Sequence, residues 1–236
     1  MTRDRPCLFI TGTDTGVGKT TICRALLSGW RKQGRKVTPL KPIETGCGEH
    51  LRALDAEALA RAAGTNPAIA CLSRWAEPLC PQAASRAAGR PLARRDIAAI
   101  LSAASHLPGE RLLVEGAGGL LVPIAPDYTM ADLIAEMGAY VLIVARSRLG
   151  TINHTLLTLS ECRRRALPLL GVILSRDVAA LGPDDSTNAG LIGEHGRVPV
   201  LGPFPHCPDA DDEELAVLAA AHLDLDGLWQ RWTAAT

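Results

Sequence analysis

The sequence is poor in aromatic side chains and carries no excess of charge of either sign. Aromatic residues make up 3% of its 236 residues, and 25 Lys and Arg balance 25 Asp and Glu. So few rings cannot form a base-stacking surface, and zero net charge gives no overall field that attracts nucleic acid or an anionic membrane. We therefore expect neither class of partner.

Paired cysteines and long apolar runs are also lacking. The seven cysteines are odd in number and scattered along the chain, and no two of them form a C-x-x-C pair. This argues against a disulfide framework and a zinc site, and indicates a reducing compartment. No run approaches the roughly 18 apolar residues of a membrane span. The apolar stretch after Arg3 and Arg5 is too short for a secretion signal. We expect a cytoplasmic protein.

Hydrophobic residues make up 47% of the chain, enough for a sizeable core. Short apolar runs alternate with helical patterns, which is typical of a parallel sheet covered on both faces. Strands are expected at Cys7–Ile10, Lys36–Leu40 (stopped by Pro42), Leu112–Val114, Leu120–Ile124, Val141–Ala145, Leu169–Leu174 and Val198–Leu201. Helices are expected at Ile22–Trp30, Leu51–Ala63, Ile97–Ala104, Thr129–Met137, Thr151–Ala166, 187–195 and Asp212–His222, with irregular chain and a short helix within 71–91.

A glycine-rich segment follows the first apolar run. Residues 10–21 read ITGTDTGVGKTT and lead into a helical pattern. Strand, loop and helix in this order are the context that a phosphate-binding loop requires. Its glycines let backbone N–H groups surround phosphate oxygens, and the helix N-terminus adds positive potential. Thr13 stands where the common motif has its first glycine, which here is Gly12. The alternative is a glycine-rich turn that merely contains Lys and Thr.

The loop predicts a nucleoside triphosphate site. Lys19 would reach the β- and γ-phosphates, and the Thr20 hydroxyl would hold Mg²⁺. The predicted nucleotide contacts in the loop are Thr13, Asp14, Thr15, Gly16, Val17, Gly18, Lys19 and Thr20. Together with the alternating pattern, they predict one nucleotide-binding catalytic domain over residues 1–236. Its fold would be α/β: a single-domain parallel β-sheet with helices on both faces, the Rossmann-like three-layer fold of phosphate-loop NTPases.

Polar and glycine-rich residues follow the other expected strands, at the sheet edge where ligands bind in open α/β folds. Glu115 ends an apolar strand and could complete a Mg²⁺ shell, although a solvated strand-end carboxylate is the alternative. The glycines after it imply that something approaches the backbone closely. Asp55 lies at helical spacing from Leu51 and Leu59, within an apolar stripe. A carboxylate there needs a metal ion or an ion pair with Arg or Lys, and both alternatives remain open. Lys41 ends the second expected strand, and a single lysine at such a position is usually only an exposed charge.

Four motifs together resemble the signature stretches of the dethiobiotin synthetase family. They are GTDTGVGKT at 12–20, KPxxTG at 41–46, VEGAGG at 114–119 and LGTINH at 149–154. Their order and spacing match, as does VPVLG at 198–202, and the resemblance covers about residues 7–205.

The resemblance implies a homodimeric, Mg²⁺-dependent enzyme of biotin synthesis that uses ATP. It would close 7,8-diaminononanoate and CO₂ (or bicarbonate) into the cyclic urea dethiobiotin, releasing ADP and phosphate. By similarity, the Mg²⁺ ligands are Thr20, Asp55 and Glu115, and the catalytic residues are Lys41 and Lys19. Further ATP contacts are Asp55, Glu115, Gly116, Ala117, Gly118, Ser175, Arg176, Pro205, His206 and Cys207. Substrate contacts are Thr45, Gly118, Gly150 and Asn153, the last two across the dimer interface.

Two features bear on alternatives. Some family members read adenine with an asparagine after the fifth strand, where this chain has Ser175, Arg176 and Asp177, so ATP, CTP and GTP stay open. A partition or division-site ATPase, a nucleotide-switched dimer, shares the expected fold. Those proteins carry a lysine two residues before the first glycine of the G-x-G-K-[ST] core, where Asp14 stands here. Residues 224–236 also lack the basic amphipathic helix that membrane attachment would use.

Overall fold

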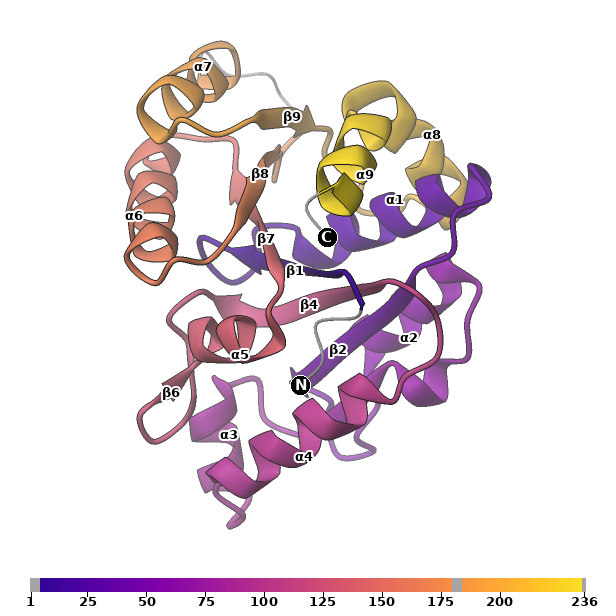
Figure 1. Ribbon diagram of the computed structural model, residues 1–236, viewed down its shortest axis with the longest axis vertical. Coiled ribbons are helices and arrows are strands. Elements are labelled where there is room, and N and C mark those ends of the chain that lie inside the picture. The colour runs from indigo at the N-terminus through magenta and orange to yellow at the C-terminus, as the bar shows by residue number, and fades with distance from the viewer. Residues whose placement is uncertain (1–4, 180–183, 235–236) are drawn as a thin grey trace.

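A computed structural model describes residues 5–179 and 184–234, which are organised around one seven-stranded sheet (Figure 1). Its strands are β1 (Cys7–Gly12), β2 (Thr38–Thr45), β3 (Cys71–Trp75), β4 (Leu112–Gly119), β7 (Tyr140–Arg146), β8 (Leu169–Ser175) and β9 (Val200–Phe204). Their order is β3-β2-β4-β1-β7-β8-β9, and every neighbouring pair is parallel. A separate antiparallel pair joins β5 (Pro123–Ala125) to β6 (Tyr128–Thr129). The predicted parallel sheet is confirmed.

Helices cover both faces of the sheet. They are α1 (Lys19–Lys32), α2 (Leu54–Ala63), α3 (Pro81–Ala87), α4 (Arg94–Ser105), α5 (Met130–Met137), α6 (Thr151–Arg164), α7 (Asp184–Gly196), α8 (Asp212–His222) and α9 (Leu225–Ala234). Successive side chains of a strand point to opposite faces. Accordingly, Leu8 and Ile10 of β1 pack in one core with α1, α8 and α9, while Phe9 packs in the other with α4, α5 and α6. The C-terminal helices α8 and α9, in yellow, lie against α1 (Figure 1).

The prediction that Pro42 stops the second strand at Lys36–Leu40 is wrong, because β2 runs on to Thr45. It pairs with β4 only as far as Leu40 and with β3 from Lys41 onward. Neighbouring residues of a strand direct their N–H groups to opposite sides, and the N–H of Lys41 donates toward β3, to the carbonyl of Ala70 at 2.7 Å. Pro42 therefore faces the β4 side beyond the end of that pairing, where its missing N–H breaks no ladder hydrogen bond.

Several other expected elements differ from the observed ones. Residues 71–91 hold the strand β3 as well as the short helix α3, and α9 was not predicted. The second helix begins at Leu54 rather than Leu51, because Leu51 adopts a left-handed φ of 49° that an α-helix excludes. The last strand, β9, spans Val200–Phe204 instead of the expected Val198–Leu201. β5 begins at Pro123 instead of the expected Leu120.

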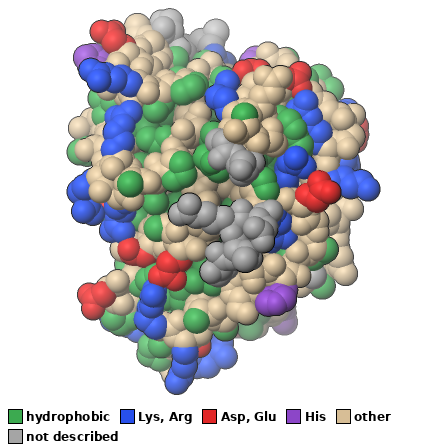
Figure 2. Space-filling model, in the orientation of Figure 1, with side chains coloured by type: hydrophobic (Ala, Val, Ile, Leu, Met, Phe, Trp, Pro, Cys, Tyr) green, Lys and Arg blue, Asp and Glu red, His purple; other side chains and the backbone are tan. Residues whose placement is uncertain are grey.

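The surface carries charges of both signs. In the view of Figure 2, Lys and Arg side chains are interspersed with Asp and Glu rather than gathered into a field of one sign. None of the helices in the described part of the chain combines the length and apolar character needed to cross a bilayer.

Candidate nucleotide and metal site

The glycine-rich loop joins β1 to α1 and is held in a tight turn. Gly16 and Gly18 have φ values of 69° and 94°, which L side chains rarely adopt, and Gly18 is the N-cap of α1. A side chain on Gly12 would collide with the carbonyl of Asp14 at 2.8 Å. The glycines are therefore needed for the loop itself, and the first turn of α1 has no acidic residue to compete with a bound anion.

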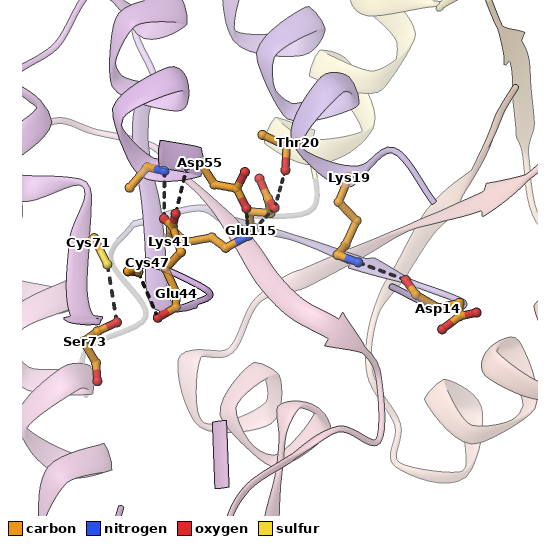
Figure 3. A network of polar contacts seen from close by, with 11 residues as sticks. Asp14, Lys19, Thr20, Lys41, Glu44, Cys47, Asp55, Cys71, Ser73 and Glu115 are labelled. Atoms are coloured by element: carbon orange, nitrogen blue, oxygen red, sulfur yellow. Dashed lines mark hydrogen bonds and ion pairs between the residues drawn. The ribbon is translucent and has the colours of Figure 1, made fainter. Parts of the chain in front are cut away.

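Lys19 and Thr20 begin α1, and their side chains diverge. The Lys19 ammonium donates to the Asp14 carbonyl at 3.0 Å, so it lies along the loop (Figure 3). The Thr20 hydroxyl donates at 2.9 Å to Oε1 of Glu115, at the neighbouring strand β4. Lys19 thus lines the expected phosphate position. Thr20 links the loop to a group formed by Lys41, Asp55 and Glu115, called the acidic centre below.

That acidic centre is organised around Lys41. Its ammonium donates to Oδ2 of Asp55 at 2.8 Å and to Oε1 of Glu115 (Figure 3). Lys41 and Glu115 are 4% and 1% exposed. Asp55 instead keeps 41% of its side-chain surface exposed, so the expected burial of this carboxylate is wrong; its carboxylate is paired with Lys41. Lys41 comes from β2, Asp55 from α2 and Glu115 from β4.

The environment sets opposite pKa shifts for the two lysines. Burial alone would lower the pKa of Lys41, but the carboxylates of Glu115 and Asp55 outweigh burial and raise it above its ordinary value. Burial lowers the pKa of Lys19, and the charge of Lys41 adds to this while Glu115 opposes it. Lys41 is therefore a fixed cation, suited to hold an anion rather than to accept a proton.

Glu44 is a buried carboxylate that the sequence did not single out. Its two oxygens accept hydrogen bonds from the backbone N–H groups of Asp55 at 2.9 Å and Ala56 at 3.0 Å. The N-cap residue of α2, Ala53, offers no side-chain cap, so Glu44 takes that role from β2. Burial raises the pKa of Glu44, although these backbone hydrogen bonds oppose the shift. Glu44 thereby fixes where Asp55 stands.

These groups open into a cleft of about 530 Å³. The predicted site residues that line it are Thr15, Gly16, Gly18, Lys19, Thr20, Lys41, Thr45, Asp55, Glu115, Ala117 and Gly118. Residues that the sequence did not indicate line it too: Thr21, Glu44, Pro78, Leu79, Cys80, Pro81 and Val122. The segment 78–81 connects β3 to the start of α3 and carries no motif, so only the fold brings it to the cleft.

The remaining predicted residues do not line this cleft. They are Thr13, Asp14, Val17, Gly116, Gly150, Asn153, Ser175, Arg176, Pro205, His206 and Cys207. Gly116 is needed for packing, because a Cβ there would lie 2.8 Å from the ring of Phe9, so what approaches this backbone is the protein itself. Ser175 lies against the loop, with its Oγ 2.7 Å from where a Cβ on Gly18 would be. Cys207 lines a second hollow, of about 620 Å³, next to α8.

The oxygen atoms of the acidic centre suit Mg²⁺. Oε2 of Glu115 is buried without a hydrogen-bond partner, and the Thr20 hydroxyl and Asp55 carboxylate reach the same centre. Hard oxygen donors of this kind are the ligands that Mg²⁺ prefers. No three His, Cys, Asp or Glu side chains among the described residues are clustered for a metal, so phosphate or water oxygens would have to complete the shell.

Comparison with known proteins adds independent findings. A family model described as an AAA domain matches residues 7–214. An ATP-dependent dethiobiotin synthetase BioD of Anaeromyxobacter dehalogenans (strain 2CP-C) is 46% identical over 190 residues, covering 78% of this chain and 81% of the relative. The enzyme of the same name from Anaeromyxobacter sp. (strain Fw109-5) is 40% identical over 212 residues, covering 88% and 93%. Among solved structures, chloroplast FtsY from Physcomitrella patens is 18% identical with a TM-score of 0.47, covering 91% of this chain and 64% of that one.

Proposed function

The chain belongs to the ATP-dependent dethiobiotin synthetase family, and on this premise we propose that its cleft converts 7,8-diaminononanoate, CO₂ and ATP into dethiobiotin, ADP and phosphate. The observation that carries the proposal is the buried Lys41 ammonium, paired with Glu115 next to Thr20 of the phosphate-binding loop. A fixed cation beside a triphosphate site is what an anionic intermediate awaiting phosphorylation requires. The enzyme is therefore an ATP-dependent ligase that forms C–N bonds.

The first step makes a carbamate. An alkylamine with a pKa near 10.4 is neutral in only about one part in 10³ at pH 7, and only the neutral amine attacks CO₂. Nearby positive charge lowers the pKa of a bound amine, and Lys19 and Lys41 both line the cleft. Once the C–N bond has formed and the amine has lost its proton, the same lysines stabilise the carbamate anion.

Phosphoryl transfer and ring closure follow. A carbamate oxygen attacks the γ-phosphorus of ATP, and ADP leaves, giving a carbamic–phosphoric anhydride. The second amine then attacks the carbamate carbon and phosphate leaves, which closes the urea ring. In this scheme Lys19 balances charge on the transferred phosphoryl group while Lys41 holds the carbamate.

We assign the Mg²⁺ ligands to Thr20, Asp55 and Glu115. Bound Mg²⁺ would neutralise phosphate charge during transfer. The unpartnered Glu115 oxygen supports this assignment, and Lys41 already neutralises part of the centre. The cation would therefore bind best together with the negative triphosphate.

The remaining assignments follow the family. Thr45 at the end of β2 would contact the diamine, and Gly150 and Asn153 would reach it from the partner subunit of a homodimer. Residues 1–236 would act as one catalytic domain in the cytoplasm, without nucleic acid or membrane partners. The support for a contact by Thr45 is that it lines the cleft, whereas Gly150 and Asn153 are exposed away from it.

The deciding experiment measures phosphate release from ATP and Mg²⁺ with and without 7,8-diaminononanoate and bicarbonate, with mass analysis of the product. Release that needs the diamine, together with a cyclic urea product, is the expected result. Hydrolysis independent of the diamine, or nucleotide binding without turnover, would contradict the proposal and favour a nucleotide-switched ATPase. Repeating the assay with CTP and GTP tests the base selectivity left open at Ser175 and Arg176.

A further inference from the structure

Arg146, the last residue of β7, contacts the phosphate-binding loop from the side opposite the acidic centre. Its Nη2 donates at 2.9 Å to the carbonyl of Thr15. The same nitrogen lies 3.2 Å from the place that a Cβ on Gly16 would occupy. The guanidinium thus lies directly against the peptide unit that joins Thr15 to Gly16.

This contact fixes the direction of one N–H group. The peptide unit is planar and trans, so its C=O and its N–H point in opposite directions. Because the carbonyl of Thr15 points at Arg146, the N–H of Gly16 points away from it. Thr15 and Gly16 both line the cleft. An N–H directed in this way is available to a phosphate oxygen.

Neighbouring charges hold the guanidinium where it is. Asp177, just past β8, has its Oδ2 3.9 Å from Nε of Arg146 and 3.1 Å from Nη1 of Arg148. Arg146 is half-buried, with 26% of its side chain exposed, and its Nε has no hydrogen-bond partner. Arg148 is 59% exposed and pairs with the same Asp177. Arg146 and Arg148 thus share one carboxylate beside the loop.

We propose that Arg146 is a positioning residue for nucleotide binding: by holding the Thr15 carbonyl it orients the Gly16 N–H toward the triphosphate. The inference rests on the proposed use of ATP, but concerns the phosphates alone and does not depend on the diamine chemistry. An N–H that is oriented before binding strengthens the ground-state complex and the transition state equally. Losing such an effect raises KM for ATP and leaves kcat nearly unchanged.

The test compares the full-length wild type with R146A, R146K and R148A. Calorimetric titration with MgATP and with inorganic tripolyphosphate is combined with kcat and KM for ATP. We expect R146A to weaken both ligands by about tenfold and to raise KM for ATP by a similar factor at nearly constant kcat. R146K, which keeps a cationic donor, should recover part of the loss. R148A removes the exposed arginine that pairs with the same Asp177 and should match wild type.

Three results would overturn the proposal. One is R146A binding tripolyphosphate as tightly as wild type while losing ATP, which would place Arg146 on the nucleoside. Another is an equal loss in R148A, which would make the effect one of general charge. The third is a lowered melting temperature in R146A and R146K with nucleotide affinity unchanged below the transition, which would leave only a structural role. Wild-type protein that binds ATP but does not turn over the diamine would contradict the proposed function and leave this test intact.

Discussion

The buried ion pair of Lys41 and Glu115 gives a prediction about stability. Both side chains are buried, and removing Lys41 leaves the buried Glu115 carboxylate without its ammonium partner. We expect K41M to lower the free energy of unfolding by about 3–5 kcal/mol. The double variant K41M/E115Q should regain most of that loss, because it buries no unpaired charge. Urea unfolding of K41M, E115Q and the double variant measures the coupling energy between the two residues. Losses that simply add in the double variant would contradict the prediction.

The same lysine gives a catalytic prediction. K41M removes the cation that would hold the carbamate, so kcat should fall by about 10²-fold or more at saturating diamine and ATP. Circular dichroism at the assay temperature ensures that the variant is folded. K36M, which removes an exposed lysine just before β2, serves as control and should keep wild-type kcat. Near-normal turnover of K41M would remove Lys41 from the mechanism.

Glu44 acts through another residue. Replacing it by alanine leaves the N–H groups of Asp55 and Ala56 without their acceptors and should destabilise the fold by about 1–2 kcal/mol. Because Asp55 is also released from its position, the Mg²⁺ concentration needed for half-maximal activity should rise about tenfold. Magnesium titration of E44A checks this. E57A provides the control, because Glu57 lies on the same helix as Asp55 and pairs only at the surface, with exposed Arg52 before the helix. An unchanged Mg²⁺ requirement in E44A would confine Glu44 to stability.

At the scale of elements, sequence patterns predicted the buried strands well and failed where sheet pairing or packing decides. β7 and β8 are largely apolar runs, and the sequence pattern was enough to predict them as buried strands. β3 has the sequence CLSRW, which no strand pattern distinguishes, and it forms because β2 offers an edge. The helix α9 was missed although Trp232 is fully buried, because its apolar side chains pack against residues far away in the chain, among them Trp30 of α1.

Helices α5 and α6 are joined by an acidic link that depends on pH. Asp132, in the first turn of α5, accepts from the Thr129 N–H and hydroxyl and pairs with Arg165, just after α6, at 2.7 Å. Burial would raise the pKa of Asp132, but these hydrogen bonds and the Arg165 charge outweigh it, and the pKa is lowered. Its stabilising effect is therefore complete above the unfolded-state pKa of about 3.9 and is lost as the pH falls through the lower folded-state value.

D132N tests this link. At pH 7 the variant should be less stable by about 1 kcal/mol, since the capping interaction and an only partly buried ion pair are weakened. The difference from wild type should stay constant between pH 7 and pH 5 and shrink below about pH 3.9. Urea unfolding curves at several pH values give the comparison. A difference that grows on acidification would contradict the assigned pKa direction.

At the scale of the whole molecule, strand order explains how much of the site could be predicted. The sequence indicated that polar residues gather at the carboxyl edge of the sheet, and the cleft at β1, β4 and β2 brings many of them together. Residues after β7, β8 and β9 reach the same edge, but these strands lie on the other side of β1. A linear pattern does not encode this order. The position of each strand across the sheet therefore became known only from the fold. That position decides which candidate residues meet in one cleft.

The last prediction concerns the proposed dimer. Leu149 is 87% exposed in the turn before Gly150, and Leu157 of α6 is 62% exposed, so apolar surface lies beside the residues assigned to a partner's diamine. Light scattering of the wild type should give twice the chain mass of 24.9 kDa. L149D places a charge in that interface and should yield monomers with a raised KM for the diamine and nearly unchanged affinity for ATP. V217D, at a residue of α8 with 62% exposure on the opposite face of the sheet, should remain dimeric. A monomeric wild type with full activity would contradict the shared site, whereas a dimeric L149D with a normal KM would place the interface elsewhere.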